Sequence, residues 1–254
     1  MLGEKSMLSD PLFYLLAVPA VILLGLAKGG FSGIGALSLP MLLFAVGPVQ
    51  AAAILLPILM VQDVVSVWAF RRTIDWGVIA AMLPGAGVGI LVGYVYAASV
   101  SPAAVMAAVG MISILFGVYR LWAERHGPPA PRHLPGWSGQ AFGVASGFTS
   151  QIAHAGAPPF QFWVLPRQLA RDMLVGTSAF FFFAVNWLKV PAYAALGQFT
   201  RENMLTAAAL MPVAILSTAA GVWLVRKVSA TRFYTAIYVL MIAVGMKLVW
   251  DGIF

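Results

Sequence analysis

The sequence predicts an all-α polytopic membrane protein, and its composition carries that prediction. Of the 254 residues, 61% are hydrophobic and only 9% are charged, whereas soluble domains carry roughly 25% charged residues. Apolar stretches close to the ~20 residues that a helix needs to cross a bilayer recur along the whole chain. The alternating pattern of a membrane barrel is absent. No cysteine occurs, which excludes disulfides and thiolate metal sites.

Ten apolar runs can be followed along the chain. They fall at about 12–27, 31–46, 48–70, 76–98, 102–122, 137–153, 155–165, 172–190, 203–226 and 230–251. The charged segment 123–136 is rich in proline and glycine, so we expect it to be a cytoplasmic linker. It would separate a first transmembrane repeat, 1–122, from a second one, 137–254. The amino end lacks the basic region and cleavage site of a secretory signal, so no cleavage is expected.

The two halves resemble each other in the positions of proline and glycine. An offset of 118 (158 − 40) aligns Pro40 with Pro158, and a later offset of 128 (245 − 117) aligns Gly117 with Gly245. An insertion of about ten residues near 193–200 would account for the change. Weak internal symmetry of this kind is typical of transporter repeats.

The charges of the connections predict how the halves are oriented. Basic residues mark 71–75, 123–133, 166–172 and 226–232 as cytoplasmic, while 46–49 and 98–101 carry no charge and should lie outside. The equivalent connections 98–101 and 226–232 then fall on opposite sides, which predicts two inverted repeats. Each would consist of a broken or re-entrant helical hairpin followed by about three transmembrane helices. Whether the hairpins cross fully stays open, because both versions place the loops alike.

The stretch 25–35 interrupts the first hairpin with glycines and with Lys28. A charge at membrane depth costs roughly 2.5–3.5 kcal/mol on insertion scales, and each glycine weakens a helix by up to about 1 kcal/mol. We therefore expect a helix break with free N–H groups around Gly30 and Gly33, and Ser32 near the cap of the next half-helix. Such a terminus beside an ammonium attracts anions. Close helix packing is the alternative for the glycines.

The stretch 143–158 is the equivalent of 25–35 in the second half, and it carries hydroxyl and amide groups in place of glycines. Ser150, Gln151 and His154 can donate to a sulfonate or carboxylate, and His154 is the natural titrating group if transport is coupled to protons. Hydrogen bonding between helices would explain the same residues without a substrate. Lys189, near the end of its run, is expected to snorkel towards the membrane surface.

Five further residues are candidates for the binding site. Asp63 lies inside an apolar run, where it would carry a coupling proton or pair with the lysine of the first hairpin. Asn186 would hydrogen-bond the substrate and Trp187 would pack against its organic part, although tryptophan is also common at the membrane interface. Thr177 and Ser178 would line the cavity, unless they bond the carbonyls of their own helix.

Four motifs link the chain to a known family. They are the glycine run ending in Ser38-Leu39-Pro40, then Arg71-Arg72-Thr-Ile-Asp75-Trp76, Pro84-Gly85-Ala86-Gly87-Val-Gly89 and Val175-Gly176-Thr177-Ser178. In their order and spacing the sequence resembles the TauE/SafE membrane proteins, also called 4-toluene sulfonate uptake permeases. The resemblance implies movement of sulfite, sulfonates, sulfoacetate or related anions without ATP hydrolysis. The second hairpin departs from it, because it reads Ser150-Gln151-Ile-Ala-His154 where glycines are usual.

We therefore expect a secondary transporter in the bacterial cytoplasmic (inner) membrane, working by alternating access on a small organosulfur anion such as a sulfonate, sulfite, sulfoacetate or a taurine-like compound. Its partners would be the lipid bilayer and a coupling proton or sodium ion. No nucleic acid, cofactor or metal is expected. An enzyme is disfavoured because no nucleotide loop, metal-ligand spacing or GxSxG motif occurs. A passive anion channel and a transporter of a non-sulfur organic anion remain alternatives.

Overall fold

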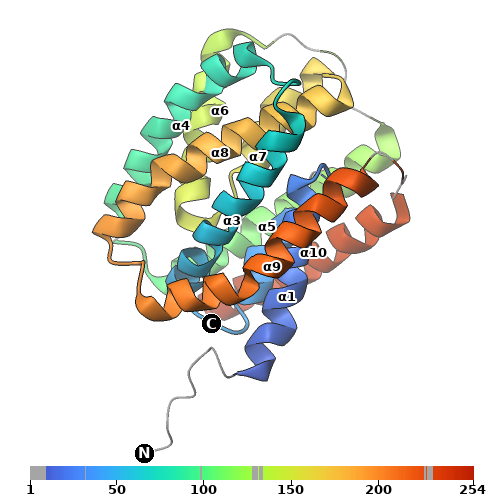
Figure 1. Ribbon diagram of the computed structural model, residues 1–254. Coiled ribbons are helices and arrows are strands. Elements are labelled where there is room, and N and C mark those ends of the chain that lie inside the picture. The colour runs from blue at the N-terminus through green and yellow to red at the C-terminus, as the bar shows by residue number, and fades with distance from the viewer. Residues whose placement is uncertain are drawn as a thin grey trace, which may run out of the picture.

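The computed structural model describes residues 10–31, 33–97, 99–127, 131, 134–225, 227 and 231–254, and within these residues every regular element is a helix (Figure 1). The elements are α1 (Pro11–Lys28), the 3₁₀ helix η2 (Ile34–Leu37), α2 (Ser38–Leu42), α3 (Pro48–Phe70), α4 (Trp76–Ala97), α5 (Pro102–His126), α6 (Gly136–Ala153), α7 (Ala157–Val164), η3 (Leu165–Arg167), α8 (Arg171–Ala195), α9 (Arg201–Leu224) and α10 (Thr231–Ile253). Seven of the helices, α1, α3, α4, α5, α8, α9 and α10, are long and apolar enough to cross a membrane. The prediction of a polytopic α-helical membrane protein is confirmed.

The helices of the two halves begin at a nearly constant separation. The differences are 136 − 11 = 125 for α6 and α1, 171 − 48 = 123 for α8 and α3, 201 − 76 = 125 for α9 and α4, and 231 − 102 = 129 for α10 and α5. The α3–α4 and α8–α9 connections each hold five residues, 71–75 and 196–200, so the predicted insertion near 193–200 is wrong. The offset of 118 is seven residues short for α1 and α6, but it is close to the separation of α2 and α7, which begin 157 − 38 = 119 residues apart. Seven residues make about two helical turns, so an alignment of α1 with α6 that is shifted by seven residues still matches the same face of each helix. The spacing of the glycines therefore does not reveal the shift.

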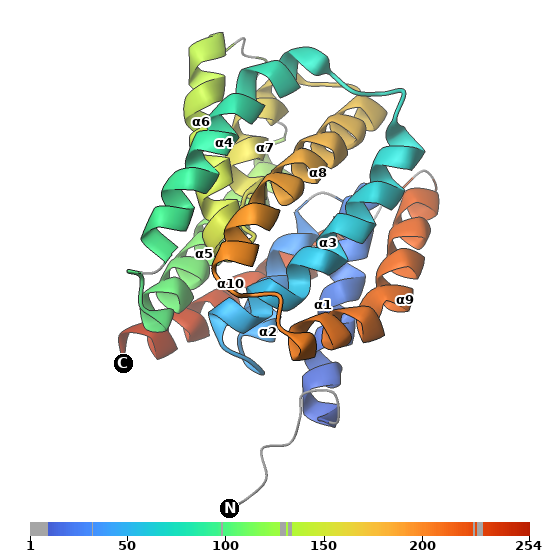
Figure 2. The same cartoon turned by 60° about the vertical axis from the view of Figure 1, so that its left-hand side comes forward.

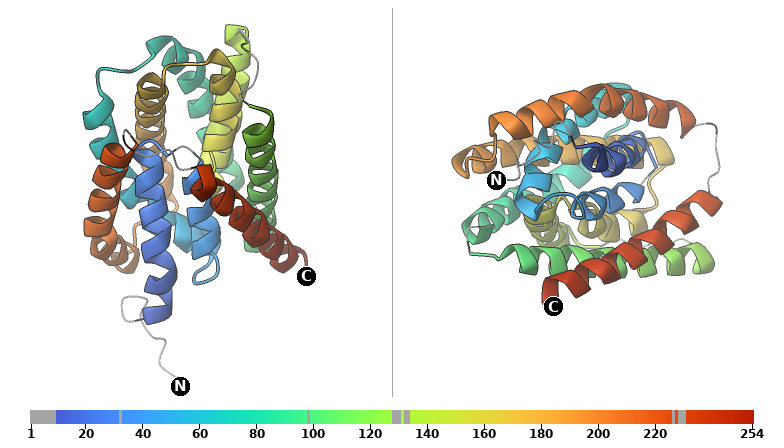
Figure 3. Two further views of the ribbon diagram at one scale, coloured as in Figure 1. Left: turned by 90° about the vertical axis from the view of Figure 1, so that its right-hand side faces the viewer. Right: turned by 90° about the horizontal axis from the view of Figure 1, so that it is seen from below.

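Helices from different halves pack against one another in matched pairs. The most extensive contacts join α4 with α6, α5 with α10 and α1 with α9, followed by α3 with α9 and α8. Figure 3 shows α5 and α10 side by side along one edge of the molecule. A Cβ atom on Gly29 would lie 2.5 Å from the backbone of Gly221, and one on Gly147 would lie 2.0 Å from the carbonyl oxygen of Ala86. These glycines let helix backbones touch, which is the packing role that small residues have in membranes.

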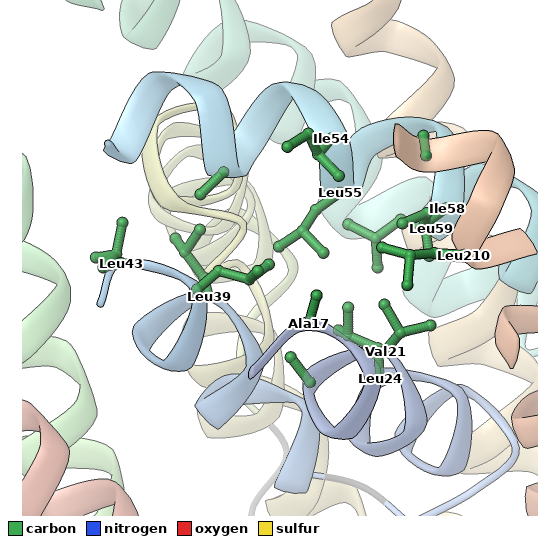
Figure 4. Packing of buried hydrophobic residues seen from close by; sticks show 14 of the residues in the cluster. Ala17, Val21, Leu24, Leu39, Leu43, Ile54, Leu55, Ile58, Leu59 and Leu210 are labelled. Atoms are coloured by element: carbon green, nitrogen blue, oxygen red, sulfur yellow. The ribbon is translucent and has the colours of Figure 1, made fainter. Parts of the chain in front are cut away.

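A buried apolar cluster holds the first hairpin against α3 and α9. It includes Val21 and Leu24 of α1, Leu39 of α2, Leu55 of α3 and Leu210 of α9 (Figure 4). Between helices in lipid the hydrophobic effect gives little net attraction, so close packing of such side chains provides much of the stabilisation. The cluster therefore holds α1 and α2 in place against α3 and α9.

Hydrogen bonds tie the α3–α4 connection and η3 to neighbouring elements at one end of the molecule. The N–H of Asp75 donates to Thr177 Oγ1 at 2.8 Å, which joins the α3–α4 connection to the start of α8. Arg167 donates to the carbonyl oxygen of Leu134 at 3.3 Å, which joins η3 to the segment before α6. α5 continues to His126, four residues into the segment expected to be the linker. α1 and α6 begin at opposite ends of the molecule (Figure 2).

Candidate functional site

The first hairpin turns at two glycines with positive φ. α1 ends at Lys28, and φ is 127° at Gly30 and 98° at Gly33, a backbone region in which a Cβ atom is strained. The N–H of Gly30 donates back to the carbonyl oxygen of Ala27 at 3.1 Å. This amide caps the end of α1, so the expected free N–H at Gly30 is not available to an anion. Ser32, expected near the cap of the next half-helix, lies outside the described residues.

The second hairpin turns at a histidine. α6 ends at Ala153, and His154 adopts the left-handed conformation, with φ 48° and ψ 22°, while its N–H donates to the carbonyl oxygen of Ser150 at 3.1 Å. A residue other than glycine in this region costs free energy, and such positions cluster at functional sites. α7 then begins with Pro158 and Pro159 in its first turn. Proline has no N–H, so this helix start offers few backbone donors to an anion.

A cavity of about 100 Å³ lies between the two hairpins and is also lined by Leu59 of α3 and by residues of α8. Since about 10–15 Å³ is enough for one water, there is room for several waters or for a small polyatomic anion. Seven of the residues expected at the site line it: Lys28, Gly30, Gly33, Ser150, His154, Ser178 and Asn186. The rest of the wall is mostly apolar and includes Phe160 and Phe182, with Gln161 as a polar residue that the sequence reasoning missed.

Lys28 and Asp63 form a buried ion pair, as one of the two alternatives for Asp63 predicted. Lys28 Nζ lies 2.6 Å from Asp63 Oδ1, and their side chains are 14% and 0% exposed. Asn186 Nδ2 donates to Asp63 Oδ2 at 2.6 Å. The carboxylate therefore joins the first hairpin to α3 and α8. Lys28 Nζ also lies 5.0 Å from the ring centroid of Phe182, a weaker cation–π contact.

A second lysine is buried beside the other hairpin, and here the expectation of snorkelling is wrong. Lys189 is fully buried. Its Nζ lies 3.1 Å from the carbonyl oxygen of Ser150, 3.2 Å from Ser150 Oγ and 2.7 Å from His154 Nδ1. Because α8 continues through Pro191 to Ala195, Lys189 lies well inside the helix. A sequence signal was present: Lys189 follows Asn186 by three residues, so both side chains share one helix face.

The contacts of His154 assign its tautomer. Its Nε2 lies 2.9 Å from the carbonyl oxygen of Ala52, which only accepts hydrogen bonds. Nε2 therefore carries the hydrogen, and Nδ1 is left to accept a hydrogen bond from Lys189. The imidazole links α6 to α3 and α8 at one wall of the cavity.

Four of the expected site residues do not line the cavity. Asp63 lies behind Lys28 and Asn186, which line it. Thr177 Oγ1 accepts the hydrogen bond from Asp75 described above. Trp187 is 51% exposed on the outer face of α8. Gln151 lines a second hollow of about 100 Å³, which is bounded by Pro48, Val100 and Gln198 at the ends of uncharged connections.

The two hollows are separated by a layer of hydrogen-bonded side chains. His154 lines the cavity and bonds Ala52, which lines the second hollow. Tyr193 donates to the carbonyl oxygen of Gln151 at 3.1 Å in the same layer. At the opposite end the cavity reaches Val175, one turn from the start of α8 and close to the basic connections.

The charges around the cavity do not balance. Asp63 is the one fully buried acidic residue in the described part of the chain, and it is paired with Lys28. Lys189 is buried with three neutral acceptors. With both lysines protonated, two positive charges stand against one negative charge. A small anion in the cavity would restore neutrality.

Comparison with known proteins matches most of the chain to one family. The family model described as sulfite exporter TauE/SafE matches residues 17–248. The protein TsaS of Comamonas testosteroni, described as a probable inner membrane transporter protein, is 27% identical over 191 residues, which cover 70% of this chain and 73% of that protein. No solved structure matches the chain.

Proposed function

This chain belongs to the TauE/SafE sulfite exporter family, and from that premise we propose that it is a secondary transporter of a small organosulfur anion in the bacterial inner membrane. The substrate would be a sulfonate, sulfite, sulfoacetate or a taurine-like compound. The observation that carries the proposal is the cavity between the hairpins, which Lys28 lines and behind whose wall Lys189 and Asp63 are buried, so that two lysines stand against one carboxylate. The description of the relative TsaS as a probable inner membrane transporter supports the same class and location.

We propose that the anion is held from both hairpins. Lys28 supplies an ammonium that Asp63 engages through one contact, which leaves further N–H donors. Ser150 Oγ accepts from Lys189, and within the described residues no acceptor is found for its own hydrogen. The Lys28 ammonium and the Ser150 hydroxyl would thus bind anion oxygens, while Phe160 and Phe182 contact an organic group. Ser178 is a weaker candidate, because its hydroxyl bonds the carbonyl oxygen of Leu174 in its own helix.

We further propose that the halves are inverted repeats that move against each other. The similar separation of helix starts, 119 to 129 residues, supports this, as does the contact between Asp63 and Asn186. These two residues are 186 − 63 = 123 apart, the same difference as the starts of α3 and α8. A two-fold axis would exchange the α1–α9 and α4–α6 pairs. Breaking the His154–Ala52 layer would then connect the cavity to the second hollow and give access from the other side.

Uptake into proteoliposomes tests the function. Radiolabelled sulfonate should enter in a saturable way, and Lys28→Met should reduce its apparent affinity at least tenfold, about 1.4 kcal/mol of lost charge interaction. Lys247→Met is the matched control, because Lys247 is exposed and pairs with Asp251 outside the cavity. Normal affinity in a folded Lys28→Met protein would remove the proposed anion site.

Two controls separate the alternatives. External unlabelled anion should accelerate release of labelled anion from a transporter, whereas flux through a passive channel would not show such exchange. Competition by carboxylates without competition by sulfonates would indicate a transporter of non-sulfur anions.

A further inference from the structure

We propose that Lys189 is the proton-binding residue of this transporter, holding one proton when an anion occupies the cavity and releasing it when the cavity is empty. This inference rests on the proposed function and names its coupling ion. It also assigns a role to a residue that lies behind the cavity wall.

Lys28, which is 14% exposed, and Lys189, which is fully buried, differ in their partners. Lys28 has the carboxylate of Asp63 at 2.6 Å. Lys189 has three acceptors, all neutral: the carbonyl oxygen and hydroxyl of Ser150 and Nδ1 of His154. Its hydrogen-bonding capacity is satisfied as an ammonium, but its charge is not. Burying such a charge without a counter-ion is costly.

The anion would supply the missing counter-ion. Ser150 and His154, which hold Lys189 from the front, both line the cavity. A negative charge there would lie just beyond them and would favour the ammonium. Charged and titratable groups near the amine are His154 on the second hairpin, Asp63 on α3 and Lys28 on α1, with Tyr193 one turn further along α8. Asp63 already binds Lys28 and Asn186, so an empty cavity leaves Lys189 without a carboxylate of its own.

The same three partners also satisfy the neutral amine. An amine has two N–H groups, which can donate to the carbonyl oxygen of Ser150 and to His154 Nδ1, and a lone pair, which can accept from the Ser150 hydroxyl. A hydroxyl rotates to suit its partner. When Lys189 is an ammonium, the Ser150 hydrogen is free to bind an anion oxygen; when Lys189 is an amine, that hydrogen is used on Nζ. Protonation and anion binding are thus coupled through one hydroxyl group.

Ser150 also provides the route for the proton. Lys189 itself does not line the cavity, whereas Ser150 does. On release, an Nζ hydrogen passes to Ser150 Oγ while the original Oγ hydrogen passes to a water in the cavity, leaving –NH₂, an intact hydroxyl and a hydronium ion. Uptake is the reverse. One monovalent anion moving with one proton carries no net charge.

Calorimetry on the purified protein measures the coupling. Methanesulfonate and 4-toluenesulfonate stay ionised across the range, and the one that binds is titrated at pH 6 to 9 in buffers of different ionisation enthalpy. Wild type should take up one proton per anion, and on the alkaline limb Kd should rise tenfold per pH unit, as reciprocal linkage requires. Lys189→Met should take up none. Lys247→Met, outside the site, should match wild type.

A second variant keeps the test decisive if Lys189→Met does not fold. Lys189→Arg retains a cation that stays protonated, so it should bind the anion with little dependence on pH. In proteoliposomes it should exchange anion for anion yet lose net uptake driven by a pH gradient.

Two outcomes overturn the inference in distinguishable ways. A wild-type protein that binds the sulfonate without proton uptake leaves the proposed function standing, and Lys189 then only caps the end of α6. A folded wild type that binds neither sulfonate overturns the inference together with the sulfonate function.

Discussion

The ion pair between Lys28 and Asp63 gives the sharpest prediction about stability. At 2.6 Å and an effective dielectric constant of about 20, the Coulomb attraction is 332/(20 × 2.6), or about 6 kcal/mol. The cost of removing both charges from water offsets much of this attraction. We therefore expect a net coupling of about 3 kcal/mol between the two side chains in a double-mutant cycle.

The two single variants should not cost the same. Lys28→Met leaves a carboxylate that is 0% exposed with Asn186 as its remaining hydrogen-bond donor, and removing one partner of a buried pair costs about 3–5 kcal/mol. Asp63→Asn leaves an ammonium that is 14% exposed and lines the cavity, where water can solvate it. This second variant should cost less. It should also bind the anion more tightly, because it removes the buried negative charge.

Reversible unfolding in mixed micelles measures the cycle. Lys28→Met, Asp63→Asn and the double variant are compared with wild type, and the double variant should be more stable than the sum of the single effects predicts. Free energies that add within about 0.5 kcal/mol, the tolerance for independent sites, would refute the reasoning. A larger loss of stability in Asp63→Asn than in Lys28→Met would refute the inference that Asp63 is the more deeply buried of the two charges.

Four other variants separate cavity residues from structural ones. Gly33→Ala places a Cβ at φ 98° and 3.0 Å from a tyrosine hydroxyl, so thermal unfolding should show a loss of about 1–3 kcal/mol; Gly87→Ala, with open space at its Cβ inside α4, should be neutral or stabilising. Thr177→Val removes the acceptor for the N–H of Asp75 and should cost about 1–2 kcal/mol in unfolding while leaving the Km for uptake unchanged. Ser178→Ala should do the opposite, with a Km raised a few-fold at nearly unchanged stability, because Ser178 lines the cavity and bonds only its own helix.

The fold was largely readable from the sequence because its signals are local. Hydrophobic runs with charged or proline-rich breaks give helix positions directly, and α3 begins and ends where the run 48–70 does. The register between the halves was not readable, since a shift of two helical turns preserves a face. One boundary was wrong: the run 172–190 stops before Pro191, but α8 continues through this proline to Ala195. Proline disturbs a helix locally, and neighbouring helices in a membrane protein can compensate for that disturbance.

The candidate site was readable where a residue type is costly at membrane depth. A lysine or an aspartate alone within an apolar run would be a costly unpaired charge, so the presence of both indicates an ion pair. Lys28 and Asp63 do form one. The sequence did not show in which direction each side chain points from its helix. Trp187 adjoins Asn186 in sequence, but neighbours on a helix point about 100° apart, and Trp187 faces outward. Lys189 shares the inward face, yet its burial depends on acceptors from another helix.

The glycine-rich hairpin and the polar hairpin therefore contribute differently to the same cavity. In the first, a turn built on positive φ lets α1 end with its lysine at the cavity wall. In the second, Ser150 and His154 accept hydrogen bonds from Lys189 of α8. A glycine at 150 would keep the carbonyl acceptor but lose the hydroxyl, so Lys189 would have one partner fewer and no path to the cavity. The Ser150 hydroxyl, which distinguishes this hairpin from a glycine-rich one, is thus one of the three groups that hold Lys189, and the proposed anion binding depends on that lysine.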